Sequence, residues 1–161
     1  MSVILPVAKQ GEDILKLKAA PAAESEFNSE WLEQLAAAMQ ATMSVREGVG
    51  IAAPQVYISK RVIIVASRPN PRYPDAPEMD AVVMVNPEIL EFSQTTCFGE
   101  EGCLSVPNER GQVERAQAVK VRYRTLQGEV VETSYEVFPA RIVQHEVDHL
   151  DGVLFVEHMK Y

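Results

Sequence analysis

Several features are scarce in this sequence, and each shortage excludes a class of protein. Only two of the 161 residues are cysteine, Cys97 and Cys103, which argues against a disulfide framework. No apolar run approaches the roughly 20 residues of a membrane-spanning helix. The first ten residues, MSVILPVAKQ, contain neither a basic leader nor a long apolar segment. We therefore expect no signal peptide and a cytoplasmic location.

Positive charge is also scarce. Lysine and arginine total 15 against 23 aspartate and glutamate residues, which gives a formal net charge of −8 at pH 7. Such a chain is poorly suited to bind nucleic acid or an anionic membrane unaided. The hydrophobic fraction of 47% is ordinary for a globular protein, and 161 residues can enclose one hydrophobic core. We expect a single domain that spans residues 1–161.

Hydrophobic spacing predicts two helices. Asn28 or Ser29 can cap the start of the first one. Its core-facing stripe recurs at helical spacing and consists of Trp31, Leu35, Met39 and Thr42. The second helix is the stretch ARIVQHEVDHL (140–150), which Pro139 opens and Gly152 stops.

The remaining regular structure is expected to be strands. RVIIVAS (61–67) and AVVMVNP (81–87) are short apolar runs, the second ended by Asn-Pro. VKVRYR (119–124) and EVVETSYEVF (129–138) alternate with period two around a turn and predict a hairpin. RPNPRYPDAP (68–77) holds four of the ten prolines and is expected to be a tolerated surface insertion. Two helices with mostly antiparallel strands predict the α+β class.

The stretch QHEVDHLDG (144–152) indicates half of a metal site. His145 and His149 are four residues apart, so a helix aims both imidazoles at one ion. Glu146, beside the first histidine, can reach a metal-bound water and move its protons. The alternative is a helix whose histidines are merely hydrogen-bonded core residues. The expected architecture is antiparallel strands packed around this helix.

The third ligand has to come from upstream. One zinc-protease pattern would place a third histidine where Phe155 stands, and His158 is the only other histidine of the tail. Cys103, in EGCLSVP (101–107), is the candidate, because a thiolate and two imidazoles leave the fourth position of a tetrahedral site open. Taken alone, Cys103 would be a buried structural thiol, and its pairing with the two histidines reverses that preference. The other cysteine is expected to be a core or surface thiol.

Three stretches in this order resemble the peptide deformylase family: GVGIAAPQ (48–55), EGCLSVP (101–107) and QHEVDHLDG (144–152). The family removes the formyl group from the N-terminal formylmethionine of new proteins and releases formate. The resemblance covers most of the chain. It implies three metal ligands, which are Cys103, His145 and His149. It also implies Fe²⁺ as the working metal, with Zn²⁺, Ni²⁺ or Co²⁺ as possible substitutes, whereas the ligand set alone would suggest zinc.

The resemblance further implies roles for residues around the metal. Glu146 corresponds to the general acid and base, while Gln55 and the backbone N–H of Leu104 correspond to donors that stabilise the oxyanion. Gly50 resembles the position where the backbone meets the substrate, and Arg110 matches a basic residue near the path of the peptide.

The sequence gives weaker indications of the residues that contact the methionine side chain and of the partners. Val49 and Ile142 are candidate walls of a methionine pocket, with ordinary core packing as the alternative. The expected partners are N-formylmethionyl nascent peptides. Some relatives carry a basic C-terminal helix, but this chain stops at Tyr161, so we expect only a transient encounter with the ribosome.

Three other functions are alternatives to this one. A metallopeptidase that cuts internal bonds is disfavoured by the missing downstream ligand and by Cys103. A module that binds N-formyl peptides without turnover is disfavoured because every expected catalytic position is filled. A deformylase that acts on short formyl peptides or on another acyl group remains open, because the pocket walls set that preference.

Overall fold

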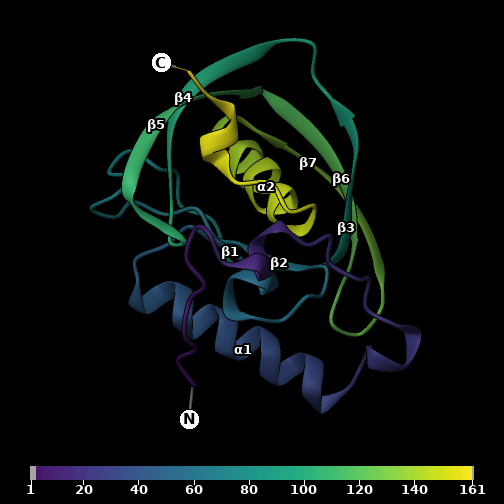
Figure 1. Cartoon of the computed structure of the whole chain (residues 1–161). Coiled ribbons are helices and arrows are strands. Elements are labelled where there is room, and N and C mark those ends of the chain that lie inside the picture. Colours follow the sequence, from purple (N-terminus) through teal and green to yellow (C-terminus); the bar gives the residue numbers. More distant parts are fainter. Residues whose placement is uncertain (1–2, 161) are drawn as a thin grey trace.

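The computed structural model describes residues 3–160, in which two α-helices combine with two antiparallel sheets (Figure 1). The larger sheet has the strand order β1-β2-β3-β6-β7: Gly50–Ala52, Val62–Val65, Val82–Phe92, Ala118–Arg124 and Val130–Glu136. The smaller sheet has the order β4-β5-β8: Thr96–Cys103, Val106–Ala116 and Met159–Lys160. The predicted α+β class is confirmed.

Helix α1 (Glu30–Val45) covers β1 and β2. Ser29 caps it, and its side chain accepts a hydrogen bond from the Leu32 N–H at 3.1 Å. The buried residues of the helix are Leu32, Leu35, Ala36, Ala38, Met39, Thr42 and Met43. The predicted stripe was wrong at its first position, because Trp31 lies at the border of this face and is 42% exposed.

Strand β3 is longer than expected. The sequence predicted an end at Asn86-Pro87, but the strand continues through an irregularity in its pairing with β6 between Val85 and Glu88. Asn86 takes a left-handed conformation (φ 51°) that asparagine tolerates better than most residues. Its side-chain amide exchanges hydrogen bonds with the backbone of Ala22 at 2.8 and 3.2 Å. The Asn-Pro pair therefore bends the strand and anchors the N-terminal segment.

The hairpin of β4 and β5 was not predicted. No strand was predicted around the stretch 101–107, whereas two long strands meet there at a turn confined to Leu104 and Ser105. Charged residues and glycines occupy much of both strands, so neither shows a regular apolar alternation. Cys103 is consequently the last residue of a strand, next to the turn.

Helix α2 (Val137–Leu150) lies between the two sheets (Figure 1) and packs against strands of both. It begins two residues before Pro139, which occupies the first turn, and β7 therefore ends at Glu136 rather than at residue 138. Its buried side chains include polar and charged ones: Arg141, Gln144, His145, Glu146 and His149. Because this helix is enclosed, each of these groups needs a partner or a function.

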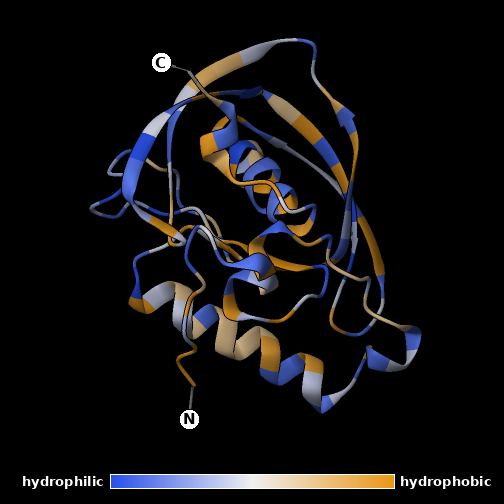
Figure 2. Cartoon of the chain, in the orientation of Figure 1, coloured by the Kyte–Doolittle hydropathy of each residue, from blue (hydrophilic) through white to orange (hydrophobic). Residues whose placement is uncertain are grey.

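Apolar side chains gather on both sides of β1 and β2. These two strands are largely hydrophobic and lie between α1 and α2 (Figure 2). Every residue of both strands is buried. Both strands pack against α2, the helix that carries the buried polar residues. No helix in the described part of the chain is long and apolar enough to cross a membrane.

Candidate metal centre and active site

Cys103, at the end of β4, meets His145 and His149 of α2. Their three donor atoms lie within 4.8 Å of one another, and Cys103 Sγ is 3.3 Å from His149 Nε2. In a tetrahedral zinc-type site, donor atoms stand about 3.3–3.8 Å apart. All three residues are buried. The spacing and the donor types therefore fit one metal ion.

The charges in this cluster also suit a cation. Burial alone would raise the pKa of the Cys103 thiol, but His149 and His145 hold it well below its ordinary value. Burial would likewise lower the pKa of His145, yet contacts with Cys103 and Glu101 raise it well above its ordinary value. A buried thiolate thus attracts positive charge, which a divalent ion supplies when both imidazoles are neutral ligands.

Glu101 orients the first histidine. Its Oε1 lies 2.9 Å from His145 Nδ1, which leaves Nε2 of that ring for the metal. Glu101 also accepts two hydrogen bonds from Arg115, both at 3.0 Å, and one from Arg141 at 2.7 Å. Although burial opposes ionisation, the hydrogen bonds from His145 and Arg115 hold the pKa of the Glu101 carboxyl well below its usual range.

This buried ion network was missed from the sequence. Glu101 was named only as the first residue of the stretch EGCLSVP, and no role was predicted for Arg115 or Arg141. A signal was present, because an arginine inside the predicted core helix requires a buried carboxylate. The sequence does not say which of the 23 acidic residues supplies it.

Glu146 lies on α2 where the helix passes close to β1. It is 4% exposed, and its Oε1 has no hydrogen-bond partner among the described residues. Burial raises the pKa of this carboxyl to about 7. The strand backbone passes so close that a Cβ added to Gly50 would lie 2.6 Å from Glu146 Oε2. Any side chain at position 50 would therefore displace the Glu146 carboxylate or the Ile142 side chain.

Gln55 is held with its amide nitrogen toward the cluster. It lies in the short helix η3 (Ala53–Val56) and is 1% exposed. Its Oε1 accepts from the Ala52 N–H at 2.9 Å, while Nε2 donates to Ser105 Oγ at 3.0 Å and faces Cys103 Sγ at 3.4 Å. No acceptor for the neighbouring Leu104 N–H is found within residues 3–160. The Gln55 amide nitrogen and the Leu104 N–H are thus two donors that belong to residues lining the same pocket.

These groups surround one pocket of about 410 Å³, counted with the open space at its mouth. The predicted residues that line it are Val49, Gly50, Gln55, Cys103, Leu104, Ile142, His145 and Glu146. Val49 and Ile142 are also buried core residues, so both interpretations of their role apply. The lining residues that were not predicted are Gly48, Arg72, Tyr73, Glu101, Gly102, Phe138 and Arg141.

The proline-rich loop at 68–77 lies at the surface, as expected, and two of its residues, Arg72 and Tyr73, also line the pocket. The Tyr73 hydroxyl accepts a hydrogen bond from the Gly102 N–H at 2.9 Å, and its ring lies 4.9 Å from that of Phe138. The prolines correctly indicated a loop, but they gave no information about its tyrosine anchor. Arg110 does not line the pocket itself; it lies over the Tyr73 ring at 4.7 Å and is paired with Glu100.

The remaining sequence candidates lie apart from the donor atoms. Phe155, which cannot bind a metal, stacks on the His145 ring at 5.9 Å and shields that side from water. His158 is exposed and contacts Asp148 at 3.4 Å. Cys97 is half-buried in β4, where Arg141 donates to its carbonyl oxygen at 2.9 Å.

Comparisons with known proteins agree on one family. The family described as polypeptide deformylase matches residues 4–161. Peptide deformylase 2 of Nostoc sp. is 46% identical over 157 residues, which cover 98% of this chain and 87% of the relative. Peptide deformylase 2 of Shewanella oneidensis is 48% identical over 153 residues, which cover 95% and 83% of the two chains.

Solved structures are similar over the whole fold. The Met-Ala-Ser-bound class I type b peptide deformylase from Acinetobacter baumannii is 79% identical, with a TM-score of 0.97 over 99% of this chain and 100% of that one. Peptide deformylase from Thermotoga maritima is 35% identical, with a TM-score of 0.85 over 98% and 99%. The family expected from the three sequence stretches is confirmed. The chain belongs to the polypeptide deformylase family, whose members are metal-dependent enzymes that remove formyl groups from newly made peptides.

Proposed function

We propose that this chain removes the formyl group from the N-terminal formylmethionine of newly made proteins and releases formate. The observation that carries the proposal is the cluster of Cys103, His145 and His149 beside a pocket that Glu146 and Gln55 also line. A similar structure from A. baumannii is bound to Met-Ala-Ser, and a free N-terminal methionine is what deformylation leaves. Family membership alone would not assign the roles of individual residues.

Cys103, His145 and His149 would hold the metal. A bound ion would supply a Lewis acid that polarises the formyl group and lowers the pKa of water to about 7. Zinc is the ordinary expectation for one thiolate and two imidazoles, and the family points to Fe²⁺, with Ni²⁺ or Co²⁺ as further substitutes. Glu101 keeps His145 in the ligand tautomer by engaging Nδ1.

Glu146 would transfer the protons. A carboxyl whose pKa lies near neutrality can take a proton from the attacking water and return it to the departing amine. Its unpartnered Oε1 is free for that purpose. Gly50 permits this arrangement by leaving space for the carboxylate.

Gln55 and the Leu104 N–H would stabilise the oxyanion. The Ala52 N–H fixes the Gln55 amide so that its NH₂ group, and not its oxygen, faces the cluster. Preorganised donors of this kind are worth about 2.7–4 kcal/mol each when one is removed from an oxyanion hole. Val49 and Ile142 would contact the methionine side chain.

Peptides with different N-terminal acyl groups test this proposal. Protein loaded with Fe²⁺ without oxygen would be given formyl-Met-Ala-Ser, acetyl-Met-Ala-Ser and a peptide blocked at both ends. We expect formate from the first peptide, little or no acetate from the second and no internal cleavage of the third. Faster acetate release would support another acyl substrate, and internal cleavage would support a metallopeptidase. Binding of the formyl peptide without formate would support a module that does not turn it over.

The close approach at Gly50 leads to a first prediction. Gly50→Ala places a methyl group against Glu146 and Ile142, at 2.6 and 2.8 Å, so the carboxylate has to move. A misplacement of about 1 Å can lower the rate by about 10²-fold. We expect a loss of that size in kcat for formate release. Metal content and the unfolding temperature, measured beside kcat, check that the site is otherwise intact. An unchanged kcat would show that the position of Glu146 does not limit the reaction.

The thiolate and ferrous iron lead to a second prediction. Both are oxidisable, so the Fe²⁺-loaded protein is expected to lose activity during storage in air. The Ni²⁺-loaded protein should lose much less under the same conditions. Parallel measurements of formate release and of free thiol content over time test this difference. Full activity of the ferrous sample after long aerobic storage would contradict it.

A further inference from the structure

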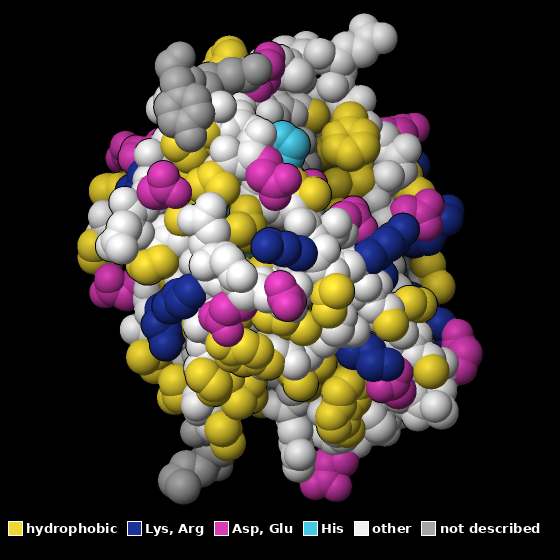
Figure 3. Space-filling view, viewed as in Figure 1, with side chains coloured by type: hydrophobic (Ala, Val, Ile, Leu, Met, Phe, Trp, Pro, Cys, Tyr) yellow, Lys and Arg dark blue, Asp and Glu magenta, His cyan; other side chains and the backbone are white. Residues whose placement is uncertain are grey.

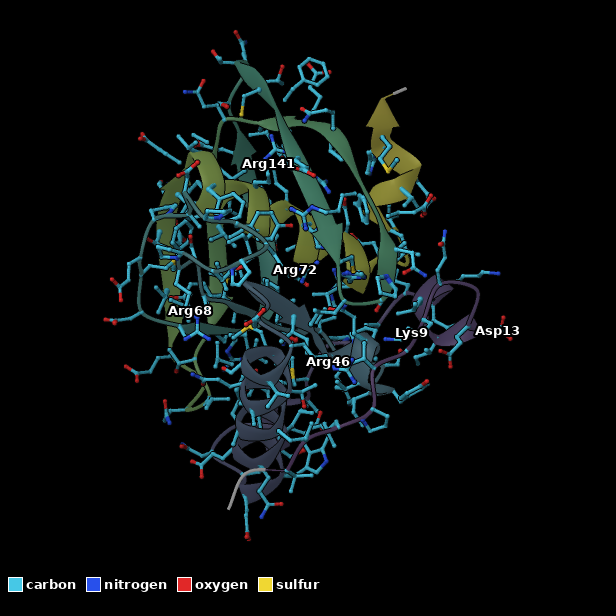
Figure 4. All side chains as sticks on the ribbon, turned by 90° about the vertical axis from the view of Figure 1, so that its left-hand side faces the viewer. Lys9, Asp13, Arg46, Arg68, Arg72 and Arg141 are labelled. Atoms are coloured by element: carbon cyan, nitrogen blue, oxygen red, sulfur yellow. The ribbon has the colours of Figure 1, made fainter. Side chains whose placement is uncertain are left out.

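A groove lined by three basic side chains leads into the catalytic pocket. It encloses about 480 Å³, counted with the open space at its mouth, and its basic residues are Lys9, Arg46 and Arg72. The groove and the pocket share three lining residues: Arg72, Cys103 and Leu104. Figure 4 views this side of the molecule, with Arg46 and Arg72 near its centre and Lys9 beside them. A chain that leaves the pocket can therefore run directly along the groove.

The three cations are not paired with carboxylates of the described residues, and Glu12, which lies beside Lys9, accepts from the Lys9 backbone N–H. Elsewhere on the surface basic residues are commonly paired, as Arg122 is with Glu132 at 2.9 Å. No ion pair of Lys9, Arg46 or Arg72 occurs in the part of the chain that the structure describes. None of the residues that line the groove is acidic. Their charges are thus available to a ligand.

Arg72 is held at the entrance to the pocket. Its Nη2 lies 3.0 Å from the position that a Cβ of Gly102 would occupy, beside the ligand Cys103. Its carbonyl oxygen accepts a hydrogen bond from Arg110 Nη2 at 3.0 Å, which fixes the backbone of the loop. On the other side of the groove, Lys9 Nζ donates to the Leu104 carbonyl oxygen at 3.3 Å. Two of the cations are therefore placed before a ligand arrives, which lowers the entropy cost of binding.

The net charge of −8 opposes the positive potential of the groove cations but does not cancel it. At about 0.1 M salt the screening length is about 10 Å, so distant carboxylates act weakly while groove cations act on a peptide in contact with them. The face in Figure 3 intersperses acidic and basic side chains among hydrophobic ones. The groove differs from that face because its charged lining is of one sign.

We propose that Lys9, Arg46 and Arg72 select substrates whose residues after the formylmethionine carry carboxylates. The inference rests on the proposed deformylation, because the groove begins where that reaction takes place. Extended peptide advances about 3.3 Å per residue, so the residues that follow the methionine are the first to enter the groove. An acidic peptide is favoured over RNA as the ligand, because the groove shares Arg72, Cys103 and Leu104 with the pocket in which the formylated end of a peptide would react.

Three amidated peptides test the proposal: formyl-Met-Glu-Glu, formyl-Met-Gln-Gln and formyl-Met-Lys-Lys. Amidation removes the C-terminal carboxylate, so only the side chains differ in charge. We expect kcat/KM for the Glu peptide to exceed that for the Lys peptide by about 10-fold at low salt, mainly through KM. The ratio should shrink as the salt concentration rises toward about 0.5 M.

Two double variants assign the effect to the groove. Lys9→Gln/Arg46→Gln removes two of the three groove cations and should lower the Glu-to-Lys ratio most of the way toward one, with Arg72 leaving a small residual preference. Lys16→Gln/Lys18→Gln removes the same charge outside the groove and should keep the ratio of the unmodified protein.

The outcomes separate this inference from the proposed function. Formate released from all three peptides at equal kcat/KM would overturn the inference and leave deformylation intact. The inference would also fail if both double variants changed the ratio equally. Equal rates together with RNA binding that Lys9→Gln/Arg46→Gln abolishes would assign the cations to RNA. No formate from any of the three peptides would overturn the proposed function itself.

Discussion

Glu146→Gln is expected to lower kcat for formate release by about 10²–10⁴-fold, the usual contribution of a positioned general acid or base. Glutamine keeps the shape of the side chain but cannot accept and return a proton. The carboxylate is buried, faces the pocket and has an unpartnered oxygen in the described structure. The loss of kcat is measured from the amounts of formate and of free methionine amine present when the reaction is stopped at set times.

The same substitution is expected to leave the fold at least as stable. Burial raises the pKa of Glu146 from 4.5 to about 7, so ionising it disfavours the metal-free folded state at higher pH. This destabilisation is absent below pH 4.5 and grows to about 3 kcal/mol above pH 7. Metal-free Glu146→Gln should therefore unfold at higher urea concentration than the unmodified protein at pH 8, with little difference at pH 4.

The pH dependence of activity should reflect the ionisation of the same carboxyl group. As the pH falls through the pKa of Glu146, the base becomes protonated and kcat/KM decreases. A bound cation lowers that pKa, so the apparent value for the loaded protein should lie at or below about 7. The acid limb should disappear from the residual activity of Glu146→Gln. A variant with nearly full kcat, or one that keeps the same acid limb, would remove Glu146 from the mechanism.

Glu101→Gln is expected to produce the largest loss of stability. It leaves the guanidinium groups of Arg115 and Arg141 buried without their carboxylate, and breaking such a pair costs about 3–5 kcal/mol. Because the pKa of Glu101 is depressed, its contribution is present above pH 4.5 and is lost as the pH falls toward the folded-state pKa. Urea unfolding of the two proteins at neutral pH and near pH 3 measures both effects.

Metal affinity should fall as well. The amide of Glu101→Gln is a weaker partner for His145 Nδ1, and such changes typically cost 10–100-fold in affinity. Glu100→Gln is the matched control, because that residue is exposed and its ion pair with Arg110 is worth at most about 1 kcal/mol. Competition with a chelator gives the two affinities. Equal stability and equal affinity for Glu101→Gln and Glu100→Gln would contradict a supporting role for Glu101.

The local parts of the site could be predicted from the sequence. The four-residue spacing of His145 and His149 fixes their relation within any helix, so it needs no knowledge of the fold. Cys103 followed from the absence of any ligand after His149 and from the agreement of three stretches with one family. The same stretches identified Gln55 and Gly50, but the steric need for glycine beside Glu146 appears only in the structure.

The parts that depend on distant contacts could not be predicted. Glu101 and Arg141 are 40 residues apart, and nothing in either local pattern names the other. Tyr73 belongs to a loop whose prolines indicated only the surface, while its hydroxyl reaches Gly102 on another strand. The β4–β5 hairpin was missed because its charged and glycine residues suppress the alternation on which strand prediction depends.

The most direct measurement is formate release from formyl-Met-Ala-Ser by protein prepared without oxygen and loaded with Fe²⁺, with Glu146→Ala beside it. Metal content and folding of both samples are determined first. The predicted result is rapid release of one formate per free methionine amine, lost in Glu146→Ala and in protein stripped of metal. A folded, metal-loaded protein that releases no formate, or a Glu146→Ala protein that releases it at the same rate, would contradict the proposed function or the proposed mechanism.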